Sequence, residues 1–171
     1  MKKTQKMLFI SILVAQALVL YIVETMIPVP FITPGAKLGL ANIITVVSLY
    51  SLSIADTFLV VILRIILSTL LVGSLSSFFF SLSGGILSLL VMFILKKFGK
   101  ENVSIIGVSV MGSVFHNIGQ ILVASITVQN IRIIAYLPVL MIAGIGTGIF
   151  VGITSKFLLA HLKKLQFTKI N

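Results

Sequence analysis

Apolar residues dominate this chain in six runs that short polar or basic segments separate. A helix needs about 20 apolar residues to cross roughly 30 Å of hydrocarbon. By this measure the pattern predicts six membrane-spanning helices, at residues 7–27, 38–52, 54–73, 77–95, 103–127 and 133–158. The second run is short, so we expect that span to be tilted, broken or only partly embedded in the membrane.

Composition supports an integral membrane protein. Hydrophobic residues make up 58% of the 171 residues and charged residues only 9%, whereas about a quarter of the residues in soluble domains are charged. The chain has no cysteine, which excludes a disulfide framework, a thiolate nucleophile and a cysteine-based zinc site. The loops between the runs are too short to hold a soluble domain, so we expect one all-α membrane domain over residues 1–171.

The basic residues are distributed unevenly over the connections between the spans. Six crossings put both termini on one side, which then carries the N-terminal lysines, the basic turn at residues 96–100 and the basic tail. Only Lys37 and Arg132 fall on the other side. Because cytoplasmic loops carry an excess of Lys and Arg, we predict a multi-pass protein of the bacterial cell membrane with both termini in the cytoplasm. The net charge of +10 therefore indicates topology and not nucleic-acid binding.

Several polar residues stand inside the apolar runs, where hydrocarbon solvates them poorly. Arg64 lies in the middle of the predicted third span, where a charge costs about 2.5–3.5 kcal/mol on insertion scales. His116 and Gln120 are four residues apart in the fifth span and so share one helical face, with Asn117 beside them. Asn42 lies near the outer end of the second span. Such residues need partners, either within the bundle or in a ligand.

Two interpretations of these polar residues are open. In the first, they line a pocket that opens outward and binds a small polar or anionic molecule, since cationic groups outnumber the acidic Glu24 on that side. In the second, Arg64 pairs with Glu24, and the polar residues of the fifth span hydrogen-bond between helices. We favour the first, and the expected substrate-binding residues are Lys37, Asn42, Arg64, His116, Asn117 and Gln120.

The scarcity of acidic residues limits the chemistry of the chain. Its carboxylate side chains are Glu24, Asp56 and Glu101, which the predicted topology divides between the two sides of the membrane. Prenyl diphosphate synthases hold magnesium with aspartate-rich segments, and this chain has a single Asp. A Walker lysine motif is also absent. We therefore expect no catalytic residues, no metal site and no resident cofactor.

Small residues at four-residue spacing predict where helices approach one another closely. Gly144, Gly148 and Gly152 lie on one face of the predicted sixth span, and missing side chains let two helix backbones meet. We expect these glycines to pack within the chain in preference to between chains. Ser11 and Ala15 form a weaker pair of the same kind on the first span.

Two segments carry a resemblance to a known family: PGAKLGLAN at residues 34–42 and FHNIGQ at residues 115–120. On these segments the chain resembles the small membrane proteins described both as heptaprenyl diphosphate synthase component I and as the Gx transporter family. It is also similar to the substrate-binding S components of energy-coupling factor importers. That similarity implies a six-helix subunit that binds a vitamin or related nutrient from outside and works with a coupling membrane subunit and two ATPases. It further implies that Ser11 and Ala15 contact the coupling subunit.

The two family labels imply different functions. The synthase label implies a role in making the isoprenoid tail of menaquinone, but a membrane chain without an aspartate-rich site cannot itself run magnesium-dependent condensation. We therefore expect a substrate-binding transporter subunit for a molecule like a vitamin, a flavin or a quinone precursor. A non-catalytic, accessory role beside a heptaprenyl diphosphate synthase is the alternative.

Overall fold

The computed structural model describes residues 3–26, 39–99 and 102–164, and these residues form helices joined by short turns. In chain order the helices are α1 (Lys3–Met26), α2 (Asn42–Ser51), α3 (Ile54–Val72), α4 (Leu75–Gly99), α5 (Ile105–Thr127), the 3₁₀ helix η2 (Ile131–Tyr136) and α6 (Leu137–Lys164). The prediction of an all-α bundle of membrane helices is confirmed.

In the described part of the chain, five segments are long and apolar enough to cross a membrane, namely α1, α3, α4, α5 and η2 continued by α6. Their outer surfaces expose large apolar side chains, such as Leu70 on α3, Ile142 on α6 and Phe157 near the end of α6. Broad apolar surfaces of this kind are costly in water and suit contact with lipid. The fold is therefore that of a multi-pass membrane protein.

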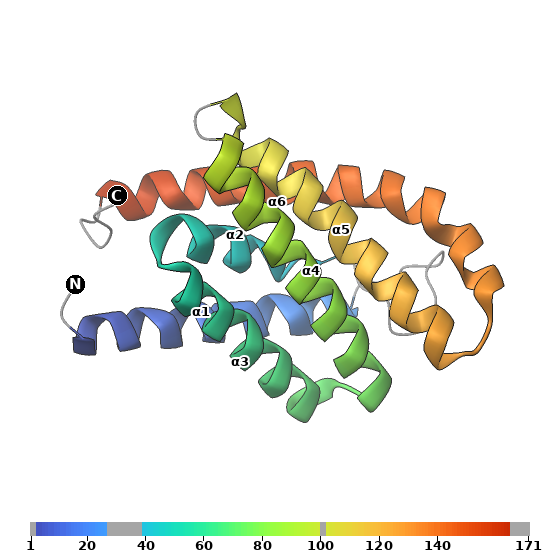
Figure 1. The fold of residues 1–171 in the computed structure, drawn as a ribbon. Coiled ribbons are helices and arrows are strands. Elements are labelled where there is room, and N and C mark those ends of the chain that lie inside the picture. Colours follow the sequence, from blue (N-terminus) through green and yellow to red (C-terminus); the bar gives the residue numbers. More distant parts are fainter. Residues whose placement is uncertain (1–2, 27–38, 100–101, 165–171) are drawn as a thin grey trace.

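The short second span that the sequence predicts at residues 38–52 corresponds to α2. Its 10 residues extend about 15 Å, which is half the thickness of the hydrocarbon layer. Residues 42–49 of α2 are all buried, and α2 contacts each of the other five α-helices. In Figure 1 it lies between α1 and α6. The second apolar run is short because it forms a half-length helix that the longer helices enclose.

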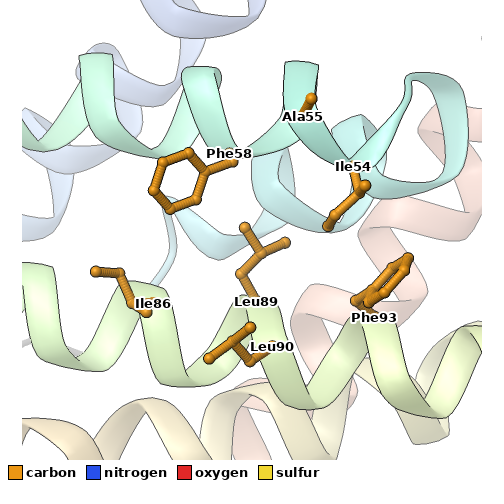
Figure 2. Close-up of a pocket in the computed structure, with 7 residues that line it drawn as sticks. All are labelled: Ile54, Ala55, Phe58, Ile86, Leu89, Leu90 and Phe93. Carbon is orange, nitrogen blue, oxygen red and sulfur yellow. The ribbon is translucent and has the colours of Figure 1, made fainter.

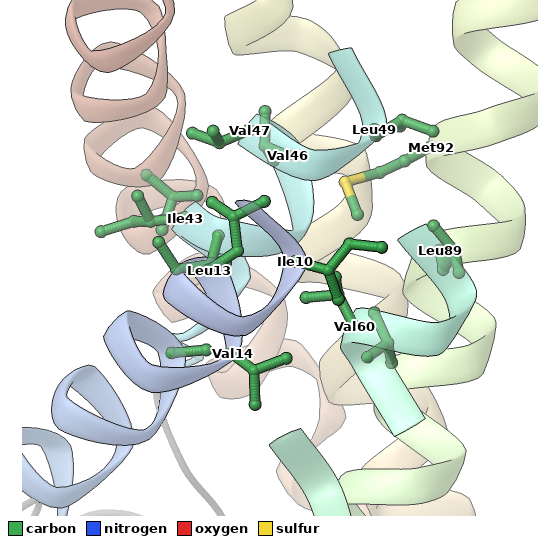
Figure 3. Packing of buried hydrophobic residues seen from close by; sticks show 14 of the residues in the cluster. Ile10, Leu13, Val14, Ile43, Val46, Val47, Leu49, Val60, Leu89 and Met92 are labelled. Carbon is green, nitrogen blue, oxygen red and sulfur yellow. The ribbon is translucent and has the colours of Figure 1, made fainter. Parts of the chain in front are cut away.

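The apolar core gathers around α2. Residues from α1, α2, α3 and α4 point toward one another in Figure 3, where the labelled side chains are Ile10, Leu13, Val14, Ile43, Val46, Val47, Leu49, Val60, Leu89 and Met92. Two of these side chains, Val46 and Val60, have no measurable exposure. Close packing of this kind fixes the position of α2 without a long hydrophobic span of its own.

Charged side chains from neighbouring helices meet both ends of α2. Ahead of its first turn, the backbone N–H of Gly39 donates to Oε1 of Glu24 on α1. At its last turn, Nζ of Lys96 on α4 donates to the carbonyl oxygen of Leu49 at 2.6 Å. Helix ends leave backbone groups unpaired, which is expensive where water is scarce. A carboxylate at the N-terminal end and an ammonium at the C-terminal end also complement the helix dipole.

The first helix begins and the last helix ends at the same end of the bundle (Figure 1). The turn between α2 and α3 lies at this end too, where Nζ of Lys6 on α1 is 2.7 Å from Oδ2 of Asp56 on α3. The chain thus reverses direction at each connection, and the half-length α2 counts as one of six passes through the bundle. Which end faces the cytoplasm stays a prediction.

Candidate functional site

Five buried residues from four helices form a polar cluster beside the N-terminal end of α2. Nη2 of Arg64 on α3 donates to Oδ1 of Asn42 on α2 at 3.2 Å. Nε2 of Gln120 and Nε2 of His116, both on α5, are 3.1 Å apart. Glu24 on α1 attracts the Arg64 guanidinium electrostatically. The polar cluster is defined here as Glu24, Asn42, Arg64, His116 and Gln120, each of which is at most 7% exposed.

Two adjacent glycines on α4 make room for the cluster. A Cβ atom on Gly84 would lie 2.9 Å from Nδ1 of His116, and one on Gly85 would lie 3.6 Å from Nη2 of Arg64. The bare backbone of α4 therefore sits against Arg64 of α3 on one side and His116 of α5 on the other. This glycine pair was not predicted as part of the site. Two adjacent glycines within a membrane helix nevertheless indicate that a neighbouring helix approaches closely.

Gly39 closes the cluster at the N-terminal end of α2. It has a φ of +88°, in the left-handed region that glycine adopts at little cost. A Cβ atom there would come 2.8 Å from Nδ2 of Asn42 and 3.6 Å from Cδ2 of His116. Its backbone N–H donates to Glu24. Gly39 thus joins α1, α2 and α5 at one point, in a position that a side chain would obstruct.

Four atoms of the cluster have hydrogen-bonding capacity to spare. Within the described residues, Nδ2 of Asn42, Nε of Arg64, Nδ1 of His116 and Oε1 of Gln120 are buried and make no hydrogen bond. An unpaired buried polar atom costs about 1–3 kcal/mol, so native proteins usually give it a partner. The cluster therefore offers two donors, one acceptor and one imidazole nitrogen to a bound polar molecule.

Asn117 faces a different neighbour from the other expected site residues. Its Nδ2 donates to the carbonyl oxygen of Leu140 on α6 at 2.7 Å. A Cβ atom on Gly144 would lie 2.9 Å from the same Nδ2. Asn117 is about 100° around the helix from His116, because each residue turns the α-helix by that angle. The structure therefore brings Asn42, Arg64, His116 and Gln120 together, and it places Asn117 between α5 and α6.

The remaining predicted residues lie apart from the cluster. Lys37 lies outside the described residues. Ser11 and Ala15 are exposed on the outer face of α1, and Oγ of Ser11 donates to the carbonyl oxygen of Met7 at 3.0 Å. Their exposed position leaves room for a partner, and the contact with a coupling subunit stays a prediction.

The glycines of α6 face the backbone of α5. A Cβ atom on Gly148 would come 2.5 Å from the Cα atom of Val110, and one on Gly152 would come 2.7 Å from the Cα atom of Ile106. Gly144 lies against Asn117 one turn further along. This spacing brings α6 close enough to α5 for the hydrogen bond between Asn117 and Leu140.

Two pockets lie away from the polar cluster. One is an apolar groove of about 300 Å³ between α3 and α4, lined by Ile54, Ala55, Phe58, Ile86, Leu89, Leu90 and Phe93 (Figure 2). The other is a pocket of about 270 Å³ between α2, α5 and α6, lined by Tyr50, Ile105, Lys156, Leu159, Ala160 and Lys163. Neither includes a residue of the cluster, so neither corresponds to the outward-opening pocket that the sequence predicts.

Comparison with models of known families matches residues 13–158 to the family described as heptaprenyl diphosphate synthase component I. No curated protein and no solved structure matches the chain. The matched segment contains α2, α3, α4 and α5 in full, and with them the whole polar cluster. The family resemblance predicted from residues 34–42 and 115–120 is confirmed, whereas the similarity to S components stays an expectation. The chain belongs to the family of heptaprenyl diphosphate synthase component I.

Proposed function

We propose that this chain is a non-catalytic, substrate-binding membrane subunit that holds a small polar or anionic molecule in the polar cluster. The observation that carries the proposal is the spare hydrogen-bonding capacity of Asn42, Arg64 and Gln120 in a buried site. A folded chain tolerates unpaired polar atoms in a bundle when a ligand completes them, and intramembrane polar groups commonly mark substrate pathways. The expected transporter type is that of the S components.

The unpaired atoms define the ligand chemistry. A carboxylate, phosphate or carbonyl oxygen of the ligand accepts from Nε of Arg64 and Nδ2 of Asn42. A ligand N–H or O–H group donates to Oε1 of Gln120. Vitamins, flavins and quinone precursors combine such groups with an apolar body, which suits a site enclosed by membrane helices.

Metal-dependent catalysis forms no part of this proposal. Among the residues that the structure describes, no three His, Asp or Glu side chains come together as a group that could hold a metal ion. Condensation of isoprenyl diphosphates needs acidic ligands for magnesium. The two described carboxylates are Glu24, in the cluster, and Asp56, paired with Lys6 at the other end of the bundle.

Gln120→Ala and Asn117→Ala test the site as a matched pair. Among the described residues, Gln120 hydrogen-bonds only within α5, whereas Asn117 joins α5 to α6. We expect Gln120→Ala to weaken ligand binding by about 1–3 kcal/mol with little loss of stability, and Asn117→Ala to lower stability by a similar amount with binding retained. The measurement is a thermal-shift and binding series on the detergent-solubilised protein with flavins and quinone precursors. Equal effects of the two variants on binding and stability would remove the distinction on which the proposed site rests.

The family description supports a second candidate function. Its printed name connects the family to heptaprenyl diphosphate synthase, so the chain is also a candidate accessory membrane subunit of that enzyme. Affinity purification from the native membrane distinguishes the two functions. Recovery of a coupling membrane protein with ATPases supports the transporter subunit, whereas recovery of a soluble prenyl synthase supports the accessory role. Robust uptake by this chain alone in liposomes contradicts the S-component type, since that type depends on ATPases.

A further inference from the structure

The pocket between α2, α5 and α6 combines an apolar floor with two lysines. Ile105, Leu159 and Ala160 supply apolar surface, and the exposed Lys156 and Lys163 complete the basic part of the lining. The two lysines are seven residues apart on α6 and therefore share one helical face. Tyr50, at the end of α2, completes the lining with a phenol group. The pocket is thus amphipathic and lies at the end of the bundle where α6 ends.

The lysines of this pocket have no acidic partner in the described part of the chain. Lys156 and Lys163 form no ion pair there, and Asp56, the described carboxylate at this end of the bundle, is paired with Lys6. A third cation stands close by, because Nζ of Lys96 lies 4.9 Å from the centroid of the Tyr50 ring. The pocket is therefore an electropositive site that an anion would neutralise.

An apolar stripe leads along α6 into the pocket. Ile142, Ile145, Ile149 and Ile153 are exposed by 73%, 44%, 42% and 42%. Their spacing of three and four residues continues through the pocket residues Lys156, Ala160 and Lys163, so all of them lie on one helical face. The face is apolar over the length of the span and basic at its end. This order matches a phospholipid, whose acyl chains run through the hydrocarbon to a charged headgroup at the interface.

The size of the pocket agrees with a headgroup. Liquid water occupies about 30 Å³ per molecule, so the pocket of about 270 Å³ corresponds to roughly nine waters. That space accommodates a phosphate with its glycerol, and the acyl chains then lie along the isoleucine stripe. Basic pockets between membrane helices on the cytoplasmic side are known to bind anionic headgroups.

We propose that Lys156 and Lys163 bind the phosphate headgroup of an anionic phospholipid, with its chains along the α6 stripe and its headgroup against Tyr50. Because Tyr50 lies in the last turn of α2 and contacts Lys96, a bound lipid holds the C-terminal end of the half-length helix at the membrane surface. The site is separate from the polar cluster, so it stands or fails independently of the proposed substrate site.

The test compares two double variants that remove the same charge. Lys156→Gln/Lys163→Gln removes both pocket lysines, whereas Lys97→Gln/Lys164→Gln removes two lysines of the same end of the bundle that do not line the pocket. Purified protein in neutral detergent is titrated with phosphatidylglycerol, phosphatidylcholine or inorganic phosphate. Bound lipids are counted by native mass spectrometry, and thermal stability is followed in parallel.

We expect the wild type and the control variant to bind phosphatidylglycerol in preference to phosphatidylcholine. The pocket variant should lose about 30-fold in affinity for phosphatidylglycerol, because each lysine near a lipid surface contributes about a factor of five. Equal loss in the two double variants overturns the site, since it shows a general charge effect. Saturation by inorganic phosphate alone at the same concentration overturns the lipid assignment.

A conservative variant distinguishes the loss of the headgroup site from the loss of the fold. Lys156→Arg/Lys163→Arg keeps both positive charges on side chains of similar length and should retain the preference for phosphatidylglycerol. If this variant binds phosphatidylglycerol no better than phosphatidylcholine, the proposed headgroup site is wrong.

Discussion

Arg64 shows how a membrane helix carries a charge in its middle. Its guanidinium donates a hydrogen bond to Asn42 and lies close to the backbone of Gly85. Glu24 attracts the guanidinium electrostatically. The sequence left two interpretations open, pairing with Glu24 or a ligand site. The structure combines features of both, because Glu24 lies near Arg64 while Nε of Arg64 has no hydrogen-bond partner among the described residues.

The charge of Arg64 is coupled to that of Glu24, and the coupling is measurable. Removing one of two buried charges that attract each other leaves the remaining charge uncompensated, which costs about 3–5 kcal/mol where the two form a direct ion pair. We therefore expect Arg64→Met to lower the free energy of unfolding by up to about that amount. Glu24→Gln keeps an oxygen that accepts from the N–H of Gly39, so the double variant Glu24→Gln/Arg64→Met should recover much of the loss.

Thermal and denaturant unfolding in detergent of the four members of this double-mutant cycle gives the coupling energy. A double variant that is no more stable than Arg64→Met would show that the two charges do not stabilise each other. Ligand binding should be lost in both variants that lack Arg64, whatever their stability, because the proposed ligand contacts its guanidinium.

Helical spacing accounts for one contact of the polar cluster. His116 and Gln120, four residues apart, do share a face and do contact each other. Adjacent Asn117 was expected to join them, but it turns toward α6. The sequence gives the angle between two side chains on one helix, whereas it does not tell which helix lies at that angle. For the same reason the pattern did not show that Gly84 and Gly85 separate Arg64 from His116.

At the scale of the elements, α2 is the unusual component. A short apolar run predicted a short or broken span, and α2 has that form. Its enclosure by five helices and the charged partners at its ends depend on contacts between residues far apart in the chain. Glu24 lies 15 residues from Gly39, and Lys96 lies 47 residues from Leu49. Periodicity carries no information about such contacts, so they could not be predicted.

The glycines of α6 provide a sharp test of packing between elements. Gly148 faces α5, where an added Cβ atom would come 2.5 Å from the Cα atom of Val110, whereas a Cβ atom on Gly146 meets nothing within 4 Å. We expect Gly148→Ala to lower stability by about 1–3 kcal/mol, because backbone atoms must move to admit the methyl group. Gly146→Ala should be neutral or slightly stabilising, since Ala favours the helix by up to about 1 kcal/mol.

Thermal unfolding of both variants under identical detergent conditions measures the difference. The two substitutions add the same atoms to the same helix, so changes in helix propensity or detergent binding affect both alike. Similar stabilities for the two variants would contradict the close approach of α5 and α6 at Gly148.

At the scale of the whole molecule, the ends of the bundle differ in charge. The described lysines of α1, α4 and α6 stand at the end where α1 begins and α6 ends, whereas Arg132 lies in η2 at the other end. The number of predicted crossings and the positions of the basic residues predicted this division. The prediction succeeded although α2 is too short to cross the hydrocarbon by itself, because α2 still runs toward the lysine-rich end, where it turns into α3 (Figure 1).

Single-cysteine labelling tests which end of the bundle faces the cytoplasm. The chain has no native cysteine, so each introduced thiol reports alone. Phe98, near the end of α4, is 73% exposed at the lysine-rich end, and Gln129 is exposed in the turn between α5 and η2 at the opposite end. A membrane-impermeant maleimide should label Gln129→Cys in intact cells, and it should label Phe98→Cys only after the membrane is permeabilised.

The two positions control each other, because an inverted protein would reverse both results. Labelling of Phe98→Cys in intact cells would place the lysine-rich end outside and contradict the charge rule for this chain. That outcome would also turn the polar cluster toward the cytoplasm, since the cluster lies beside the N-terminal end of α2, away from the lysine-rich end. A binding subunit for import must present its site outward, so the labelling pattern tests the direction of the proposed transport as well as the topology.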